Sequence, residues 1–229
     1  MILNRWIVEN LVLLVPQGAE YQAVCRGLKQ HPGTVPFVLP IPVGVNAVRR
    51  YLQTWKQLPK QVYVLGLCGS LNPEYQVGEV VLYQKCLYVR EELHKQDCHP
   101  ALTATLQTQL NSKMKWATAL TCDRILHLAA DKRNLGETYN ADIVDMEGFA
   151  VLDILSPLGV EVAMLRVVSD DCNGDLPNLA GTLSEEGALL PLPLAIRMIR
   201  QPLAASRLIR GSLKALQVLQ TLAQTLNFS

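Results

Sequence analysis

The sequence predicts an α/β protein, a three-layer α/β/α sandwich around a central mixed sheet. Short apolar runs that end at glycine or proline are typical of strands buried on both faces. Segments with helical spacing of apolar residues separate these runs, and this alternation favours a sheet covered by helices. The chain of 229 residues is long enough to bury a sizeable core.

The first elements follow from apolar runs and their ends. Residues 10–15 predict a buried strand, because the run is apolar and stops at Pro16. Residues 19–30 have helical spacing and predict a helix. Residues 35–43 are apolar but contain three prolines, which confines them to an irregular or edge strand. Residues 45–56 predict the second helix.

The later elements continue the alternation. Strands are expected at 61–65, 79–89, 116–121 and 160–168, and a helix at 146–155. The glycine-containing stretch 66–70 is expected to be a turn. His94, Cys98 and His99 are assigned to a polar connecting loop, since a zinc site would need a second pair of ligands. We therefore expect neither a metal ion nor a cofactor.

The C-terminal tail differs from the rest, because no acidic residue follows Glu186. Pro202 divides it into two helices, so residues 1–229 are expected to form one domain, with a core at about 8–187 and a basic helical pair at 188–229. Arg200, Arg207, Arg210 and Lys214 fall on one face of roughly 80°, whereas Leu208, Ile209, Leu213, Leu216 and Leu219 lie away from it. This pattern fits a helix packed on the core or a helix lying on a membrane surface.

Composition excludes several classes of protein. The net charge of +1 gives no field that would attract nucleic acid. The longest early apolar run, 11–16, is too short to span a bilayer, and no signal peptide is expected. Six cysteines without a C-x-x-C pair indicate a reduced, cytoplasmic protein.

Acidic residues near the expected strand ends suggest a ligand pocket. Glu20 follows the first strand, and Ser169 and Asp170 end the last one. Glu147 lies at the start of an apolar helix. Ligands of α/β sheets bind beyond the carboxyl ends of the strands. Each residue also has a simpler interpretation: Glu20 and Glu147 suit helix dipoles, and Ser-Asp is a common helix cap.

Three motifs together resemble the nucleoside phosphorylase and nucleosidase superfamily. They are V-L-G-L-C-G-S-L-N-P-E-Y-Q-V-G-E-V-V-L, V-D-M-E-G-F-A-V and L-R-V-V-S-D, in the order of that family. The resemblance covers about residues 10–175 and implies a nucleoside phosphorylase-like fold that acts as a homo-oligomer without a cofactor. The tail more loosely resembles the branch called hopanoid-associated phosphorylases.

The resemblance also implies roles for individual residues. Glu147 would accept hydrogen bonds from the ribose hydroxyls, and Met146 would pack on the sugar. Asp170 would deliver a proton to purine N7, while Glu20 holds and activates the attacking water. Other expected contacts to the substrate come from Cys68, Gly69, Ile125, Leu126, Ser169 and Arg166, of which Arg166 would lie near Glu20 and orient it.

The co-substrate is left open between water and phosphate. Val64 and Leu67 occupy places where trimeric phosphorylases of this family hold phosphate, and neither side chain binds an anion. These residues favour hydrolysis of a purine nucleoside of adenosine type. Arg49 or Arg50 from a neighbouring subunit would restore phosphorolysis, which the tail resemblance favours, with an adenosyl-lipid as substrate. A noncatalytic nucleoside-binding protein is the remaining alternative.

Overall fold

A computed structural model of the chain describes residues 10–182, 184, 187 and 190–228. The strands are β1 (Leu11–Pro16), β2 (Phe37–Ile41), β3 (Gln61–Ser70), β4 (Val80–Val89), β5 (Leu93–Asp97), β6 (Lys115–Thr121), β7 (Ile143–Asp145) and β8 (Glu161–Asp170). The α-helices are α1 (Ala19–Leu28), α2 (Val45–Gln53), α3 (Pro100–Leu110), α4 (Ala129–Tyr139), α5 (Gly148–Leu155), α6 (Pro191–Arg200) and α7 (Pro202–Thr225). Two short 3-10 helices are η1 (Asn111–Lys113) and η2 (Ser156–Leu158). The expected core boundaries near residues 8 and 188, and also Glu186, lie outside the described residues.

The eight strands form one mixed sheet, as predicted, but part of it closes on itself. β8 pairs with β3 on one side and with β4 on the other, and β7 joins β3 to β6. Since β4 also pairs with β6, the strands β3, β8, β4, β6 and β7 form a ring. β2 and β1 extend the sheet from β3, and β2 is the edge strand that its prolines predicted.

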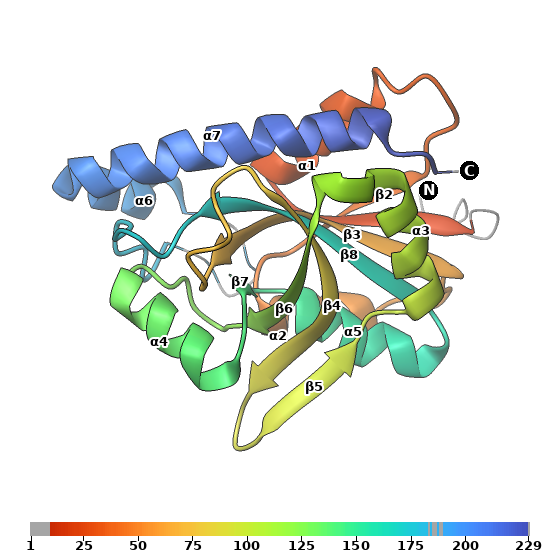
Figure 1. The fold of residues 1–229 in the computed structure, drawn as a ribbon, viewed down its shortest axis with the longest axis horizontal. Coiled ribbons are helices and arrows are strands. Elements are labelled where there is room, and N and C mark those ends of the chain that lie inside the picture. Colours follow the sequence, from red (N-terminus) through yellow and green to blue (C-terminus); the bar gives the residue numbers. More distant parts are fainter. Residues whose placement is uncertain (1–9, 183, 185–186, 188–189, 229) are drawn as a thin grey trace.

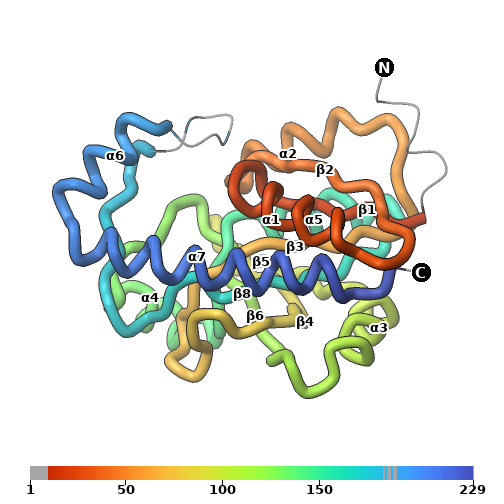
Figure 2. Tube along the Cα trace, turned by 90° about the horizontal axis from the view of Figure 1, so that it is seen from above, coloured from red at the N-terminus to blue at the C-terminus, as the bar shows by residue number. Residues whose placement is uncertain are grey.

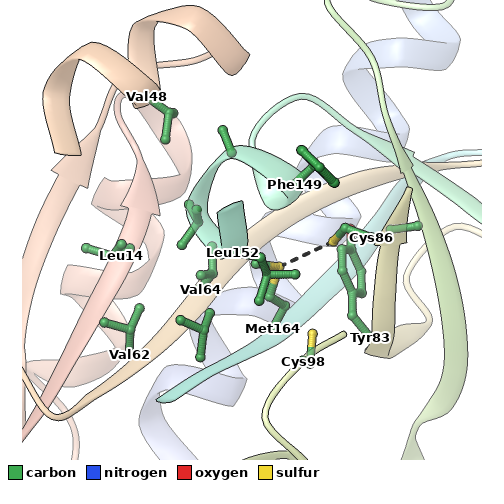
Figure 3. Packing of buried hydrophobic residues seen from close by; sticks show 14 of the residues in the cluster. Leu14, Val48, Val62, Val64, Tyr83, Cys86, Cys98, Phe149, Leu152 and Met164 are labelled. Carbon is green, nitrogen blue, oxygen red and sulfur yellow. Dashed lines mark hydrogen bonds between the residues drawn. The ribbon is translucent and has the colours of Figure 1, made fainter. Parts of the chain in front are cut away.

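Helices cover both faces of the sheet, which confirms the α/β class (Figures 1 and 2). Side chains alternate along β1: Val12 and Leu14 pack with α2 and α5, whereas Leu13 and Val15 pack with α1, α3 and α7. Both sets are fully buried, so β1 is apolar throughout and does not alternate with polar residues. Figure 3 shows the first of these cores, where Val48, Phe149 and Leu152 from the helices meet Val64 and Met164 from the strands.

The long helix α7 belongs to the core. It lies beside α1 and across β8, and it buries Ala215, Leu219, Leu222 and Ala223 against the sheet. A fully buried leucine side chain contributes roughly 1.5–3 kcal/mol. α7 therefore packs on its own domain, and its arginines lie on the outer side.

Three predictions about local structure are wrong. Residues 66–70 are not a turn, because β3 continues through them to Ser70 with a bulge after Cys68. The loop assigned to His94, Cys98 and His99 contains β5 and the cap of α3, where His99 Nδ1 accepts from the amide of Leu102 at 3.4 Å. The helix expected from Met146 begins at Gly148. In each case a long-range strand contact or a cap outweighs the local pattern.

Two further features concern the chain as a whole. The six cysteines all lie within the described residues, and none of them forms a disulfide. Across the described part of the chain, no helix combines the length and the apolar character needed to cross a bilayer.

Candidate active site

A cavity of about 500 Å³ opens beyond the ends of β1, β7 and β8, between the sheet and the helices α6 and α7. All the predicted site residues except Arg166 line it: Glu20, Cys68, Gly69, Ile125, Leu126, Met146, Glu147, Ser169 and Asp170. A neighbouring cavity of about 620 Å³ shares Ile125 and Met146 but not the three acids Glu20, Glu147 and Asp170. The three acids that could take part in a reaction therefore all line the first cavity.

Glu20 lies in the first turn of α1, and its carboxylate is held by the strand beside it. Glu20 Oε2 accepts the backbone amide of Leu67 at 2.6 Å. This approach requires Gly66, because a Cβ there would lie 3.0 Å from Pro16 Cδ and closer still to Glu20 and Arg166. Burial raises the pKa of Glu20 from 4.5 to about 8, partly offset by Arg166. Glu20 is thus more than the dipole-neutralising acid of the simpler interpretation.

Glu147 reaches the cavity because β7 runs antiparallel to β3, so the chain after Asp145 returns toward Leu67. Glu147 Oε1 accepts the amide of Gly44 at 3.2 Å, and it makes no side-chain cap to α5. Burial raises its pKa from 4.5 to about 7, against the lowering effect of Arg166. This carboxylate is directed toward the cavity and not toward its own helix.

Asp145 is a buried acid that the sequence reading missed. Its Oδ1 accepts the Thr121 hydroxyl at 2.7 Å, and its Oδ2 accepts the amide of Gly148 at 3.1 Å. These bonds fix the turn that carries Met146 and Glu147. The D-M-E-G sequence could have indicated this role, because an aspartate three residues before a helical amide commonly caps it.

Arg166 lies beneath the acids and does not line the cavity. Its side chain is fully buried, with Nη2 3.4 Å from Glu147 Oε2 and 3.5 Å from Asp145 Oδ2, and Nη1 4.0 Å from Glu20 Oε2. Burial alone would lower the pKa of Arg166, but its anionic neighbours raise it above the usual value. The arginine therefore lies near Glu20, whereas the expected direct contact with substrate does not fit its buried position.

Asp170 ends β8 and has a polar partner for each carboxyl oxygen. Ser169 Oγ donates to Oδ2 at 2.6 Å, and Lys132 Nζ forms an ion pair with Oδ1. The next described helix begins only at Pro191, so Ser169 and Asp170 do not form the helix cap of the simpler interpretation. Gly69 leaves room for Asp170, since a Cβ there would lie 2.8 Å from Oδ1.

Lys132, on α4, was also missed. No local pattern marks this lysine, because α4 was not predicted and polar residues lie all around it. Its contact with Asp170 depends on where α4 packs against the segment after β8. Only tertiary structure provides that information.

The C-terminal helices form the apolar end of the cavity. α6 contributes Leu194 and Met198, and α7 contributes Leu208, Ile209, Ser212, Leu213 and Leu216. The basic face of α7 points away, with Arg207 Nη1 3.4 Å from Asp171 Oδ1. The residues expected to lie opposite the basic face thus line the cavity or, for Leu219, the core.

A partly closed mixed sheet carries acids at its strand ends around one cavity, which fits an enzyme that binds a small molecule. A family comparison shows which class of enzyme this is, the enzymes that cleave the N-glycosyl bond of nucleosides. Residues 20–186 match the family described as the phosphorylase superfamily, and the chain belongs to that superfamily.

Solved structures of similar fold are nucleosidases. 5'-Methylthioadenosine/S-adenosylhomocysteine nucleosidase from Helicobacter pylori superposes with a TM-score of 0.66 at 15% identity, over 94% of this chain and 98% of that one. Futalosine hydrolase from the same species gives 0.65 at 14% identity, over 94% and 97%. The Campylobacter jejuni methylthioadenosine nucleosidase gives 0.61 at 17%, over 93% and 99%. At these identities the likeness concerns the fold. No curated protein matches the chain significantly in sequence.

Proposed function

We propose that this protein hydrolyses the N-ribosyl bond of a purine nucleoside of adenosine type and releases the free base. The observation that carries the proposal is the contact between Glu20 and the Leu67 amide. At 2.6 Å the Glu20 carboxyl group occupies the Leu67 amide, so this backbone donor is not free to bind an incoming phosphate. Water as co-substrate does not need this donor, and Glu20 can act as its base.

The cations also support water as co-substrate. Arg49 pairs with Asp153 at 2.5 Å, and Arg166 is buried under three acids. Among the described residues that line the cavity, Arg124 is the one cationic residue. Its side chain is 72% exposed. Phosphorolysis, the alternative, would require an arginine from a neighbouring copy in a homo-oligomer.

The proposed mechanism assigns one task to each acid. Glu147 accepts the ribose hydroxyls, and Met146 packs on the sugar. The bond between C1′ and purine N9 breaks through an oxocarbenium-like transition state, and its electron pair moves into the purine. Asp170 delivers a proton to N7, so the base leaves neutral. Glu20 takes a proton from the water that bonds to C1′.

The apolar end of the cavity supports a substrate whose 5′ substituent is apolar. This end of the cavity is lined by Leu194 and Met198 of α6 and by Ile209 and Leu213 of α7. A 5′ hydroxyl group would be too small and too polar to pack against these side chains. An alkylthio group fits this chemistry, and a lipid-linked adenosyl group is its extreme case. Ile125 and Leu126 give the base apolar contact and backbone donors but no aromatic stacking.

We further propose that the outer face of α6 contacts an anionic membrane from the cytoplasmic side. Leu192 and Ile199 are 73% and 79% exposed on the side opposite Leu194 and Met198, and Leu203 at the start of α7 is 88% exposed. Arg200 lies in the last turn of α6, and the tail after Glu186 has no acids. The charge suits anionic lipid, and a second copy of the chain is the competing occupant.

Product analysis tests the proposed reaction. The protein is incubated with adenosine or a 5′-alkylthioadenosine, with and without phosphate, and the sugar is separated by chromatography. Free ribose or its 5′-substituted form at equal rates in both samples is expected. A ribose-1-phosphate that appears only with phosphate would establish phosphorolysis. Binding measured by calorimetry without release of base would establish the noncatalytic alternative.

A further inference from the structure

Lys132 is a fully buried lysine next to the proposed acid, and the mechanism above gives it no task. Its Nζ is ion-paired with Asp170 Oδ1 and donates to the carbonyl of Asp171 at 3.0 Å. Removing an ammonium group from water has a penalty of several kcal/mol, so a buried lysine keeps its charge only beside a counter-charge. Its counter-charge here is the residue that must protonate the purine.

The position of Lys132 is fixed by its own helix. Ala129, Lys132 and Arg133 lie on one side of α4, as their spacing requires. The Ala129 amide donates to Asp175 Oδ1 at 2.8 Å, and Arg133 Nη1 donates to the Cys172 carbonyl at 2.5 Å. All three therefore bind the segment that follows β8, which holds Nζ against Asp170.

The other charged groups around the pair are engaged elsewhere. On the segment after β8, Asp171 pairs with Arg207 of α7 at 3.4 Å. On α4, Asp131 lies 4.0 Å from Arg124. On β3, burial raises the pKa of the Cys68 thiol well above its usual value, so this thiol stays neutral. Among the described residues, Asp170 is the acid that Lys132 Nζ contacts.

We propose that Lys132 is the proton source for the leaving purine and acts through Asp170 as a positioning residue, an inference that rests on the proposed N-ribosyl hydrolysis. In the resting pair the proton belongs to the lysine, and Asp170 is a carboxylate. As the C1′–N9 bond breaks, the proton on Nζ moves to Asp170 Oδ1, so an Nζ–H bond breaks and an O–H bond forms; this O–H bond then breaks as the N7–H bond forms. Lys132 is left neutral, Glu20 has gained the proton of the attacking water, and exchange with solvent restores both groups.

This arrangement changes the pH range in which the acid works. An aspartic acid alone loses its proton near pH 4, whereas a lysine holds its proton to about pH 10. A lysine–aspartate pair therefore keeps one proton available through neutral pH. An unpaired aspartate would hold that proton only in acid.

Two substitutions at Lys132 separate proton supply from charge. Lys132→Met has nearly the same length but neither charge nor proton, and Lys132→Arg keeps the charge but does not release its proton. Lys113→Met is the matched control, because it removes a lysine charge at an exposed position of η1 that does not line the cavity. If Lys132→Met does not fold, Lys132→Gln replaces it, since glutamine still donates hydrogen bonds.

The expected result is a change in pH dependence. In Lys132→Met, kcat should fall by about 10²-fold at neutral pH, with KM changed less than about threefold. The falling limb of kcat/KM should move to lower pH by at least about 2 units. Lys132→Arg should be as slow as Lys132→Met, and Lys113→Met should keep the wild-type profile. An unchanged profile in Lys132→Met, or wild-type turnover in Lys132→Arg, would overturn the proposal.

An infrared measurement keeps this inference separate from the proposed reaction. Difference spectra between each protein and its Asp170→Asn counterpart report whether Asp170 is ionised, without any substrate. We expect a carboxylate band at neutral pH in both the wild type and Lys132→Met, and a protonated carboxyl band in Lys132→Met only as the pH falls toward about 4. A protonated Asp170 in the wild type would refute the proton source. A wild type with the expected bands but no release of base would instead refute the reaction.

Discussion

Glu20 and Leu67, which are 47 residues apart in sequence, are joined by a 2.6 Å hydrogen bond from the Leu67 amide to Glu20 Oε2. This bond occupies the Leu67 amide with a carboxyl group, so that backbone donor is not free to bind an anion. It also fixes the orientation of the proposed base before any substrate arrives, which lowers the cost of reaching the reactive geometry.

Glu20→Gln should separate activity from stability. The amide oxygen still accepts from Leu67, but glutamine is not a base, so kcat should fall at least about 100-fold. A carboxyl whose pKa rises from 4.5 to about 8 on folding stabilises the fold in acid, and this contribution is lost as the pH rises toward 8. The variant should therefore gain a few degrees of Tm over wild type at about pH 8 and less at about pH 5. Exposed Glu137→Gln is the control, and a uniform loss of Tm would contradict the argument.

The pH–rate profile should show the ionisation of Glu20. A base works only when deprotonated, so kcat/KM in the wild type should climb as the pH rises toward about 8. Initial rates in buffers of constant ionic strength measure this limb. A profile that is flat from about pH 5 to pH 9 would assign the base to another group.

Asp170→Asn should lose turnover more than affinity. Asparagine accepts hydrogen bonds but transfers no proton, so kcat should fall at least about 100-fold with little change in KM. The variant also leaves Lys132 without its counter-charge, so Tm should fall, and adding Lys132→Met should restore Tm but not activity. Glu147→Gln is the contrasting variant and should weaken nucleoside binding as well. Wild-type turnover in Asp170→Asn would remove Asp170 from the mechanism.

Gly66→Ala should displace the side chains of Glu20 and Arg166 that pack against Gly66. The new methyl group would meet Arg166, Glu20 and Pro16, which are packed tightly against this glycine. We expect a loss of about 1–3 kcal/mol in unfolding free energy by denaturant titration and a fall in kcat. Gly33→Ala is the control, because its neighbour is the side chain of His31. Equal effects of the two substitutions would show that close packing at Gly66 is not required.

Removing the apolar outer face of α6 should weaken membrane binding. The variant Leu192→Ser with Ile199→Ser should reduce co-sedimentation with anionic vesicles at low salt at least about 10-fold. Leu158→Ser is the control, because Leu158 is 58% exposed and lies in η2, outside α6 and α7. Wild-type protein that stays in solution would refute lipid contact. An oligomer that the double variant dissociates, measured by light scattering, would assign the face to a second copy.

The sequence by itself determined the class of fold and the acids of the candidate site. Apolar runs such as 10–15 and 160–168 can be recognised because burial on both faces leaves a purely local signal. Glu20, Glu147 and Asp170 stood out only as a set near the expected strand ends, because each alone also suits a helix dipole or a helix cap. The family motifs then supplied their expected roles.

Only the tertiary structure decided how these residues act together. Ring closure through β7 and β8 brings Asp145, Glu147 and Arg166 into contact, although β7 has only three residues and carries no recognisable pattern. The same closure carries β3 through 66–70, where the glycines predicted a turn. Lys132 meets Asp170 only because α4 packs against the end of β8. The partner of a buried charge is set by contacts across the fold, and these leave no trace in local spacing.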